Sequence, residues 1–477
     1  MKQFITLLFI LLGVNSFAQY AKFEAMLSDS LMKNASISFY VADANTGSEI
    51  FSYNPKTSLI PASNMKLVSS AAALELLGSD YIFKTTIGYT GVLNIRNGTL
   101  NGDIIIKGGG DPALGSNNFS EHYEGFVEQW VEAIKNAGIK RINGRVITDD
   151  SHFDFDPVAP RWLWEDLGMS YGAGIFGLSI FDNTCTIRVR SASNGTDVEL
   201  IDIAPSLDGY ILTNRLKTLG TVGNWYVYTV PYSTSGWLSG TIPATSRELV
   251  MRASIPDPPL MAAQILSKRL VEEKINISGV PSTARIENIT NIDITYLTQT
   301  NSPELKLITE ILNRASNNLY ADTFTKELGK QFVGNGTFLG GTKVLMQFLS
   351  SAGVDTLGIF IEDGSGLSAR NAMNAEAIAT LLIYMKNNGK HFDDFLSSLP
   401  EAGRSGTLSQ FFTDPVFESN LKAKSGSMTR VRCYSGYFTS KSGKEMVFSI
   451  LVNNFQGTSG NVIRHIEEVL KEIILTD

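Results

Sequence analysis

The stretch PASNMKLVSSAAALELLG, residues 61–78, is the most informative part of the chain. A proline shortly before a helix and a glycine just after it are typical boundaries, so the stretch predicts a helix over residues 65–77 that stops at Gly78. The helix is rich in alanine and apolar on nearly every face. It should therefore be buried in the middle of a domain.

A serine and a lysine stand at the start of this helix. Ser63 and Lys66 are three residues apart, so they share one helical face. A buried lysine can lose its charge and accept the proton of a serine hydroxyl, which makes Ser63 a candidate nucleophile and Lys66 a candidate base. The spacing alone is a weak signal, because S-x-x-K also occurs at Ser30 and Ser419. A helix cap beside a solvated lysine fits it too.

Segments with strand character lie near both ends of the chain. Apolar, β-branched runs at residues 35–43 and 49–53 predict two strands, and runs at 432–439 and 445–452 predict a hairpin. Much of the chain between residue 302 and the predicted hairpin has helical periodicity. We therefore expect one sheet assembled from N- and C-terminal segments and flanked by helices, an α+β architecture.

Residues 81–289 differ in composition from both flanks. They are rich in Asn, Gly, Ser and Thr, and short strands and turns dominate, with only occasional helical pieces. We interpret this region as a β-rich insertion, with two subdomains, into a discontinuous domain formed by residues 19–80 and 290–477. No fixed-period repeat is present.

A second pattern lies at Ser316-Asn317-Asn318. A serine and an amide two residues apart can both face a cleft where a helix begins. Ser316 could relay a proton and Asn318 could hold a substrate amide. S-x-N also occurs at Ser52 and Ser116, and a helix-capping serine is the simpler alternative.

A third pattern is Lys424-Ser425-Gly426-Ser427, just before the predicted C-terminal hairpin. A lysine on a strand edge can bind a carboxylate, and Gly426 would let a ligand approach the backbone closely. The same tripeptide, K-S-G, recurs at residues 441–443, where we expect it to form the hairpin turn.

The sequence patterns of other catalytic, metal-binding and nucleotide-binding sites are absent. There is no G-x-S-x-G elbow and no H-E-x-x-H, and the four histidines show no metal-ligand spacing. Gly108-Gly109-Gly110 is not followed by the G-K-[ST] of a phosphate-binding loop. We expect neither a metal nor an organic cofactor.

Composition and the N-terminus bear on location and partners. The 477 residues carry a net charge of −7 with no block of basic residues, which argues against a nucleic-acid partner. Residues 1–18 have a lysine, a short apolar run and small residues before Gln19, the pattern of a cleaved signal peptide. The run is about half the ~20 residues that span a bilayer, so a membrane anchor is the weaker alternative. Cys185 and Cys433 are expected to be buried and free, although pairing stays open.

With all three patterns present in order, the chain resembles the low-molecular-mass class C penicillin-binding proteins, the D-alanyl-D-alanine carboxypeptidase/DD-endopeptidases. The resemblance covers nearly all of residues 19–477. It extends to the stretches IKGGGDPAL, INGRVITDDSHFD, ASNNLYADTFTKELG, EDGSGLSARN and AKSGSM. It implies a penicillin-binding sheet-and-helix domain split by an insertion between the first and second patterns.

The resemblance also implies roles for individual residues. Ser63 would form an acyl-enzyme with peptidoglycan stem peptides or with β-lactam inhibitors, and Lys66 would be its base. Ser316 would complete the proton relay and Asn318 the substrate contacts. Lys424 and Ser425 would bind the terminal carboxylate, with Gly426 beside them in the substrate-binding site. The backbone N–H groups of Ser63 and Ser427 would bind the oxyanion. The location implied is the periplasm.

The sequence departs from the family pattern in two places. The third pattern is K-S-G where members more often have K-T-G, and Ala369 precedes the arginine that often follows DGSGLS directly. In some relatives that arginine helps to hold a stem-peptide side chain. The corresponding candidates here are Trp164, Asp166, Tyr171 and Arg370. Trp164 and Tyr171 could equally be ordinary core aromatics.

Two other functions are compatible with parts of the sequence. A β-lactamase would share the serine, lysine and K-S-G patterns, but an insertion of this size suits a polymeric substrate better. A catalytically silent wall-binding protein would not need all three patterns. We therefore favour an exported serine DD-peptidase that cleaves D-Ala-D-Ala and D-Ala cross-link bonds.

Overall fold

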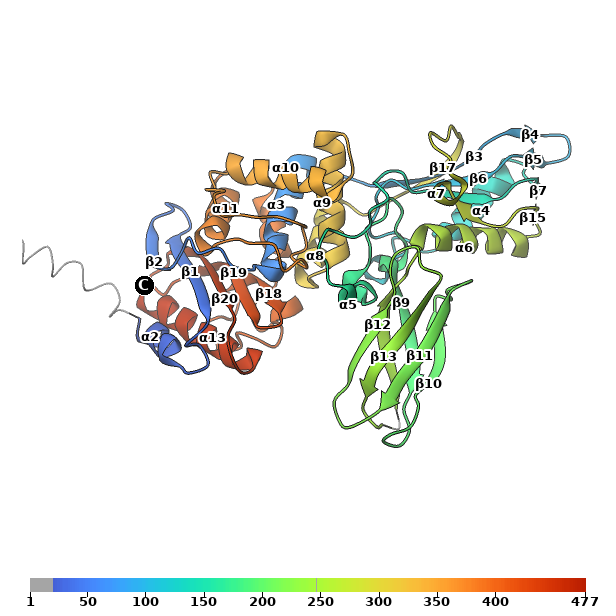
Figure 1. Ribbon diagram of the computed structural model, residues 1–477. Helices are drawn as coiled ribbons and strands as arrows, with labels where there is room; N and C mark the ends of the chain where they lie inside the picture. Colours follow the sequence, from blue (N-terminus) through green and yellow to red (C-terminus); the bar gives the residue numbers. More distant parts are fainter. Residues whose placement is uncertain (1–19, 246) are drawn as a thin grey trace, which may run out of the picture.

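The computed structural model describes residues 20–245 and 247–477 as an elongated molecule (Figure 1). One sheet with its helices forms one end, and two groups of smaller sheets form the other. The signal peptide expected over residues 1–18 lies outside the described residues. No helix in the described ranges is both long enough and apolar enough to cross a membrane.

The largest sheet joins the two ends of the chain. It is antiparallel and has the order β18-β19-β20-β1-β2, which places blue N-terminal strands beside red C-terminal ones in Figure 1. Its strands are β1 (Ser36–Asp43), β2 (Glu49–Tyr53), β18 (Lys422–Met428), β19 (Val431–Thr439) and β20 (Glu445–Asn453). This is the arrangement expected from the strand-like runs at both chain ends.

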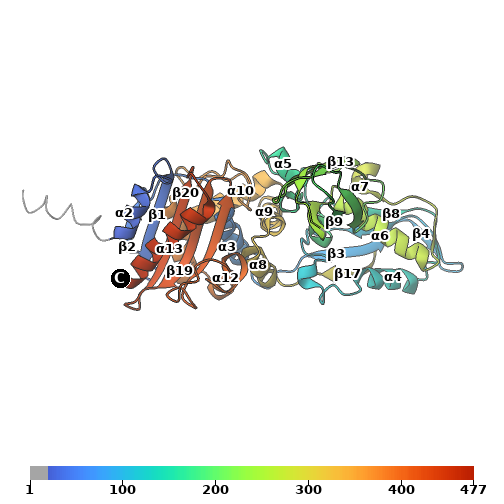
Figure 2. The same ribbon diagram turned by 90° about the horizontal axis from the view of Figure 1, so that it is seen from below.

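Both faces of this sheet are covered. Phe39 and Phe448 pack into a core beneath α2 (Ala21–Ser28) and α13 (Ser459–Thr476). Tyr40 and Val447, their neighbours in sequence, face the opposite core. Successive side chains of a strand point to opposite faces, so a run that is apolar throughout fits a sheet buried on both sides. Figure 2 shows α13 lying across the sheet.

Helix α3 (Met65–Leu77) runs through the centre of the second core. Every residue from Met65 to Leu74 is buried. This confirms the burial that its apolar composition predicts. The helices around α3 are α8 (Leu305–Arg314), α9 (Asn318–Val333), α10 (Phe338–Ser351), α11 (Ala375–Asn388) and α12 (Phe392–Ser398).

The chain between α3 and α8 builds two groups of sheets. The first group has the orders β16-β8-β6-β3-β17 and β15-β7-β5-β4. Its elements are β3 (Lys84–Tyr89), β4 (Val92–Asn94), β5 (Thr99–Asn101), β6 (Ile104–Lys107), α4 (Phe126–Asn136), β7 (Arg141–Ile142), β8 (Val146–Asp149), α6 (Pro258–Glu272), β15 (Asn276–Ile277), β16 (Ser282–Thr283), α7 (Ala284–Glu287) and β17 (Thr295–Asn301). β17 lies beyond the expected boundary at residue 290 yet pairs with β3, so this sheet continues to Asn301.

The second group projects as the green lobe of Figure 1. It comprises two three-stranded sheets, β10-β9-β14 and β11-β13-β12. Their strands are β9 (Thr184–Arg190), β10 (Glu199–Ala204), β11 (Ile211–Thr218), β12 (Asn224–Tyr228), β13 (Ser235–Ile242) and β14 (Glu248–Ser254). The short helix α5 (Trp164–Leu167) contacts β12. It stands between this lobe and the end of the molecule that carries α3.

Candidate active site

Ser63 lies in a single 3-10 turn, η1 (Ala62–Asn64), that leads into α3. The turn packs against β18 so closely that a Cβ built on Gly426 would lie 2.5 Å from the carbonyl oxygen of Pro61. Only glycine fits there. Ala62 has a positive φ of 46°, an uncommon backbone conformation for a residue with a side chain. Ser63 is therefore held tightly between the central helix and the edge strand.

The ammonium of Lys66 is fully buried directly behind Ser63. Its Nζ lies 3.0 Å from Ser63 Oγ, and it also donates to Asn318 Oδ1 (2.5 Å) and to the carbonyl oxygen of Ser365 (2.6 Å). Burial lowers the pKa of Lys66 to about 8. A lysine with this environment can be neutral near physiological pH and accept the proton of Ser63.

The start of α9 brings the second pattern to the same place. Ser316 has a positive φ of 55° and ends the connection from α8. Asn317, not Ser316, caps α9 by accepting from the N–H of Tyr320, so the simpler alternative of a capping serine is wrong. Asn318 accepts from Lys66 and donates through Nδ2 to the carbonyl oxygen of Tyr171 (2.8 Å).

Lys424 on β18 completes a chain of polar groups. Its Nζ donates to Ser316 Oγ (2.9 Å) and to the carbonyl oxygen of Ser425 (2.8 Å). Burial, reinforced by the nearby charge of Lys66, places the pKa of Lys424 well below its usual value. Ser425 Oγ donates to Thr407 Oγ1 (2.7 Å), a residue that no sequence pattern indicated. The second K-S-G lies in the turn between β19 and β20, as expected.

An open pocket of about 490 Å³ lies over these groups. Ser63, Ser316, Asn318 and Ser427 line it, whereas the two lysines lie beneath its surface. The opposite wall comes from the chain between α3 and α8. It consists of Leu163, Glu165, Asp166, Tyr171 and Tyr226. The site is therefore a cleft between two parts of the molecule.

The four residues expected in a stem-peptide pocket are only partly brought together. Asp166 and Tyr171 line the cleft, and the Tyr171 hydroxyl donates to Asp166 Oδ1 (2.9 Å). Burial raises the pKa of Asp166 above its usual value. Trp164 and Arg370 are exposed and are not among the residues that line the cleft. Trp164 instead packs against Tyr228 and Trp237.

Two buried carboxylates support the site and were not singled out from the sequence. Asp322 on α9 accepts from the N–H groups of Gly364 (2.7 Å) and Ser365 (3.0 Å), and so fixes the carbonyl that Lys66 contacts. Burial, with Asp363 close by, raises the pKa of Asp322 to about 8. Asp363 accepts from Trp162 Nε1 (2.8 Å). Both carboxylates lie in stretches that resemble the family, but their convergence on Lys66 requires the fold.

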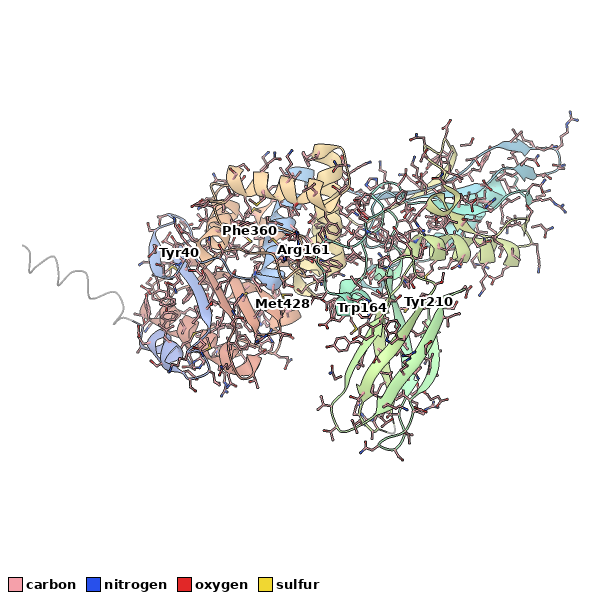
Figure 3. The ribbon with its side chains drawn as sticks, in the orientation of Figure 1. Tyr40, Arg161, Trp164, Tyr210, Phe360 and Met428 are labelled. Carbon is pink, nitrogen blue, oxygen red and sulfur yellow. The ribbon has the colours of Figure 1, made fainter. Side chains whose placement is uncertain are left out.

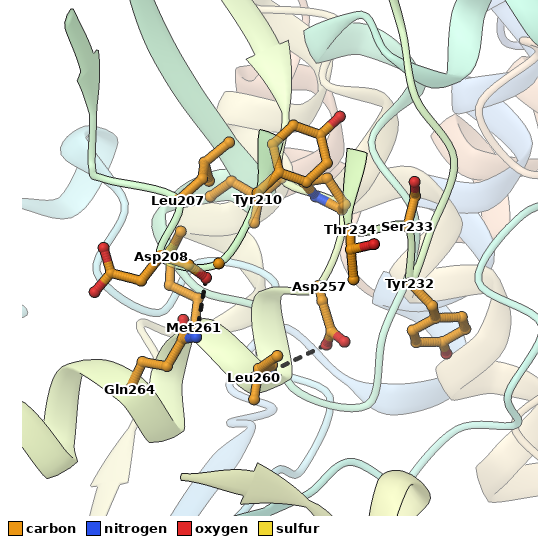
Figure 4. A pocket seen from close by; sticks show the side chains of 13 residues that line it. Leu207, Asp208, Tyr210, Tyr232, Ser233, Thr234, Asp257, Leu260, Met261 and Gln264 are labelled. Atoms are coloured by element: carbon orange, nitrogen blue, oxygen red, sulfur yellow. Dashed lines mark hydrogen bonds between the residues drawn. The ribbon is translucent and has the colours of Figure 1, made fainter. Parts of the chain in front are cut away.

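A second, smaller pocket of about 70 Å³ has a different character (Figure 4). It lies between the green lobe and α6 and contains none of the three sequence patterns. Asp257 caps α6 by accepting from the N–H of Leu260 (3.1 Å), and it also pairs with Arg285. Gln264 donates to the carbonyl oxygen of Asp208 (3.2 Å). The Gln264 contact joins α6 to the lobe.

Comparisons with known proteins find a matching family and similar relatives. A family model described as the D-Ala-D-Ala carboxypeptidase 3 (S13) family matches residues 19–474. The chain is 29% identical over 454 residues to a D-alanyl-D-alanine carboxypeptidase of Actinomadura sp., covering 91% of this chain and 80% of that protein. It is 27% identical over 467 residues to a penicillin-sensitive carboxypeptidase A of Dictyostelium discoideum, covering 91% and 86%.

A solved structure shows the same fold. The crystal structure of penicillin binding protein 4 from Haemophilus influenzae matches with a TM-score of 0.79 at 22% identity, covering 92% of this chain and 95% of that chain. This similarity confirms the α+β fold class expected from the sequence.

Proposed function

Because the chain belongs to the D-Ala-D-Ala carboxypeptidase 3 (S13) family, we propose that it hydrolyses D-Ala-D-Ala bonds of peptidoglycan stem peptides through an acyl-enzyme on Ser63. Family membership makes it a serine-type carboxypeptidase and confirms the resemblance to class C penicillin-binding proteins. The observation that supports the residue assignment is the 3.0 Å contact between Ser63 Oγ and the buried Nζ of Lys66.

Acylation begins with the transfer of the Ser63 proton to neutral Lys66. Ser63 Oγ attacks the carbonyl carbon of the penultimate D-Ala, and negative charge develops on the carbonyl oxygen. The backbone N–H groups of Ser63 and Ser427 are the proposed donors to this oxyanion. Both residues line the cleft, and η1 packs directly on β18.

Departure of the terminal D-Ala requires a proton on its amine. The hydrogen bonds Lys424–Ser316 and Lys66–Ser63 place both lysines within one proton transfer of a serine hydroxyl. We assign Ser316 as the relay to the leaving amine. Water then attacks the acyl-enzyme. The same acylation at a D-Ala cross-link would release a different amine, which is the endopeptidase reaction.

Lys424 and Ser425 are the proposed site for the terminal carboxylate. The two hydrogen-bond partners of the Lys424 ammonium are neutral oxygens, and its burial is costly. An incoming carboxylate would supply the opposite charge, raise the pKa of Lys424 and so be bound tightly. Asn318 is the proposed contact for the substrate amide, and its position between Lys66 and the Tyr171 carbonyl supports this role.

β-Lactams would acylate Ser63 in the same way and leave slowly. We also propose export to the periplasm, supported by the signal-peptide pattern of residues 1–18. Peptidoglycan lies outside the cytoplasm, so this location agrees with the proposed substrate.

The test is release of D-Ala from a peptide ending in D-Ala-D-Ala. Wild-type protein should release one D-Ala per peptide, and Ser63→Ala should release none. Ser419→Ala is the matched control, because Ser419 also begins an S-x-x-K pattern but lies outside the cleft. Equal activity of Ser63→Ala and wild type would refute the assignment.

A further inference from the structure

An aromatic surface lies beside the cleft on the green lobe. Trp164 from α5 meets Tyr228 and Trp237 from the neighbouring strands β12 and β13, with ring centroids 4.9 and 5.8 Å away. Tyr228 and Trp237 stack at 5.2 Å. Trp164 remains 56% exposed despite these contacts, and the other two rings are half-buried. Figure 3 labels Trp164 where α5 meets the top of this lobe.

The register of the sheet explains why these rings share one face. Tyr228 stands opposite Trp237, and Tyr226 stands opposite Ser239. Paired residues of adjacent strands project to the same side. The alternate residues Trp225 and Val227 instead pack toward the core. The rings are therefore an outward-facing feature and not part of the lobe's interior.

The surface is continuous with the cleft. Tyr226 lines the cleft and lies 6.1 Å from Tyr228, and Leu163 and Glu165, which flank Trp164, line it too. Two steps of 6.1 and 5.2 Å thus lead from the cleft wall to Trp237. An extended five-residue stem peptide spans about 17 Å, so a group at its far end can reach these rings.

Polar side chains surround the rings on the same face. Thr213 stands opposite Trp237 on β11, and Arg215 stands opposite Ser239. Thr213 and Arg215 are exposed, and Ser239 is half-buried. Aromatic rings with hydroxyl and guanidinium donors around them match a sugar ring. A pyranose offers a flat C–H face for stacking, with hydroxyl and acetamido groups around its rim.

We infer that the surface formed by Trp164, Tyr228 and Trp237 binds the glycan strand to which the stem peptide is attached. This inference rests on the proposed function for the identity of the substrate. Exposed, contiguous aromatic surface on a monomer commonly marks a binding site, and Trp and Tyr combine a large apolar area with a polar edge. The glycan would thereby hold the stem peptide over the cleft.

Binding is tested first without catalysis. Ser63→Ala protein is titrated calorimetrically with peptide-free glycan strands of alternating N-acetylglucosamine and N-acetylmuramic acid. Adding Trp164→Ala or Trp237→Ala should raise Kd about tenfold, the equivalent of one lost aromatic contact of about 1.4 kcal/mol. Tyr296→Ala is the matched control, because Tyr296 is 58% exposed on β17, outside this surface, and should leave Kd unchanged.

Kinetics then test the link to the substrate. The same pentapeptide is supplied free and attached to a disaccharide. Trp237→Ala should raise KM for the disaccharide form about tenfold with kcat unchanged, and should leave the free peptide unaffected. If Trp237→Ala fails to fold, Trp237→Phe should retain binding, and Trp164→Ala still decides the titration.

Three outcomes would overturn the inference. Glycan strands that do not bind, or that bind equally to all variants, would show that the surface has another use. An equal rise of KM for both substrates would assign the rings to the peptide. If wild-type protein cleaves neither substrate, the proposed function fails, but the titration still decides glycan binding independently.

Discussion

The chemistry of the site depends on the charge of one buried amine. Lys66 can act as a base only when neutral, and its burial lowers its pKa to about 8. The rate of acylation should therefore increase as the pH is raised through about 8 and fall below it. The measurement is kcat/KM for D-Ala release against pH. A flat profile between pH 6 and 9 would contradict this role of Lys66.

Replacing Lys66 with an uncharged side chain tests its role as the base. Lys66→Met should lower the acylation rate by roughly 10²–10⁴-fold, the usual contribution of a general base. Lys422→Met is the matched control, because Lys422 is the lysine of the S-x-x-K pattern that begins at Ser419. Single-turnover acylation of both variants checks the prediction. Comparable losses in both would assign the effect to the fold and not to the base.

Asp322 should act on catalysis through Lys66, as a positioning residue. In its ionised form, which is favoured above its raised pKa of about 8, Asp322 raises the pKa of Lys66, and its Oδ1 accepts from the N–H groups of Gly364 and Ser365. Asp322→Asn keeps an acceptor but removes the charge. The pKa of Lys66 should fall, and the acid limb of the pH profile should move down by roughly one pH unit. An unmoved limb with a lower plateau would indicate a purely structural role.

The residues of the site were predicted from the sequence to different extents. Ser63, Lys66, Ser316, Asn318 and Lys424 could be found because the chemistry requires those residue types at fixed spacings. Asp322 and Asp363 could not, because a buried carboxylate acts through contacts that only the fold brings together. The same reason explains Trp164, whose ring packs on β12 and β13 and does not line the cleft.

At the scale of elements, α9 and α10 pack with their backbones almost in contact. A Cβ built on Gly341 of α10 would lie 2.0 Å from the carbonyl oxygen of Thr325 on α9. Gly341→Ala must therefore push the helices apart, and it should destabilise the protein by about 2–3 kcal/mol. The thermal unfolding midpoint measures this effect.

The control for this packing is a glycine with free space around it. A Cβ on Gly460, near the start of α13, would meet only a hydroxyl at 3.8 Å. Gly460→Ala should stabilise the helix by about 0.5–1 kcal/mol, because alanine is the better helix former. A loss of stability in Gly341→Ala no larger than the change in Gly460→Ala would contradict the close approach of the helices.

Element prediction worked best where burial dictates the pattern. Helix α3 and strands β1, β2, β19 and β20 lie within a residue or two of their predicted bounds. Most residues of α3, β1, β19 and β20 are buried, whereas β2 is buried only at its centre. The helical periodicity expected from residue 302 onward did not reveal the break between α8 and α9. That break depends on the positive φ of Ser316, which local composition does not encode.

At the scale of the whole molecule, α9 joins the end that carries α3 to the inserted chain between α3 and α8. Its Glu327 is buried and accepts from His152 Nε2 (2.7 Å) and the Tyr81 hydroxyl (2.6 Å) of the inserted chain. Lys326, beside it, pairs with Asp154 (2.5 Å). The helix that carries Asn318 into the cleft is therefore also the helix that fixes the opposite wall. We therefore expect the contacts of Glu327 and Lys326 to contribute to the free energy of unfolding of the whole protein.

Glu327→Gln tests the junction and its pH dependence. Burial alone raises the pKa of Glu327, but hydrogen bonds from His152, Tyr81 and Gln331 outweigh burial and hold the pKa below its usual value. A lowered pKa stabilises the fold above the unfolded value of about 4.3, and this contribution is lost as the pH falls through the folded-state pKa. The variant should be about 1–3 kcal/mol less stable at pH 7, and the difference should shrink below about pH 4.

Unfolding midpoints from pH 3 to pH 8 check this prediction. Glu272→Gln is the control, because Glu272 pairs with Arg269 at the surface and should change little at any pH. A difference between wild type and Glu327→Gln that stays constant to pH 3 would mean that the carboxylate charge does not stabilise the junction.

The most direct test of the central claim is mass spectrometry of the protein after incubation with benzylpenicillin. Wild-type protein and Ser419→Ala should each gain one penicilloyl group that persists, and Ser63→Ala should gain none. Rapid loss of the group with turnover of the antibiotic would favour a β-lactamase. No adduct on the wild type, or an adduct that remains when Ser63 is replaced, would contradict an acyl-enzyme on Ser63.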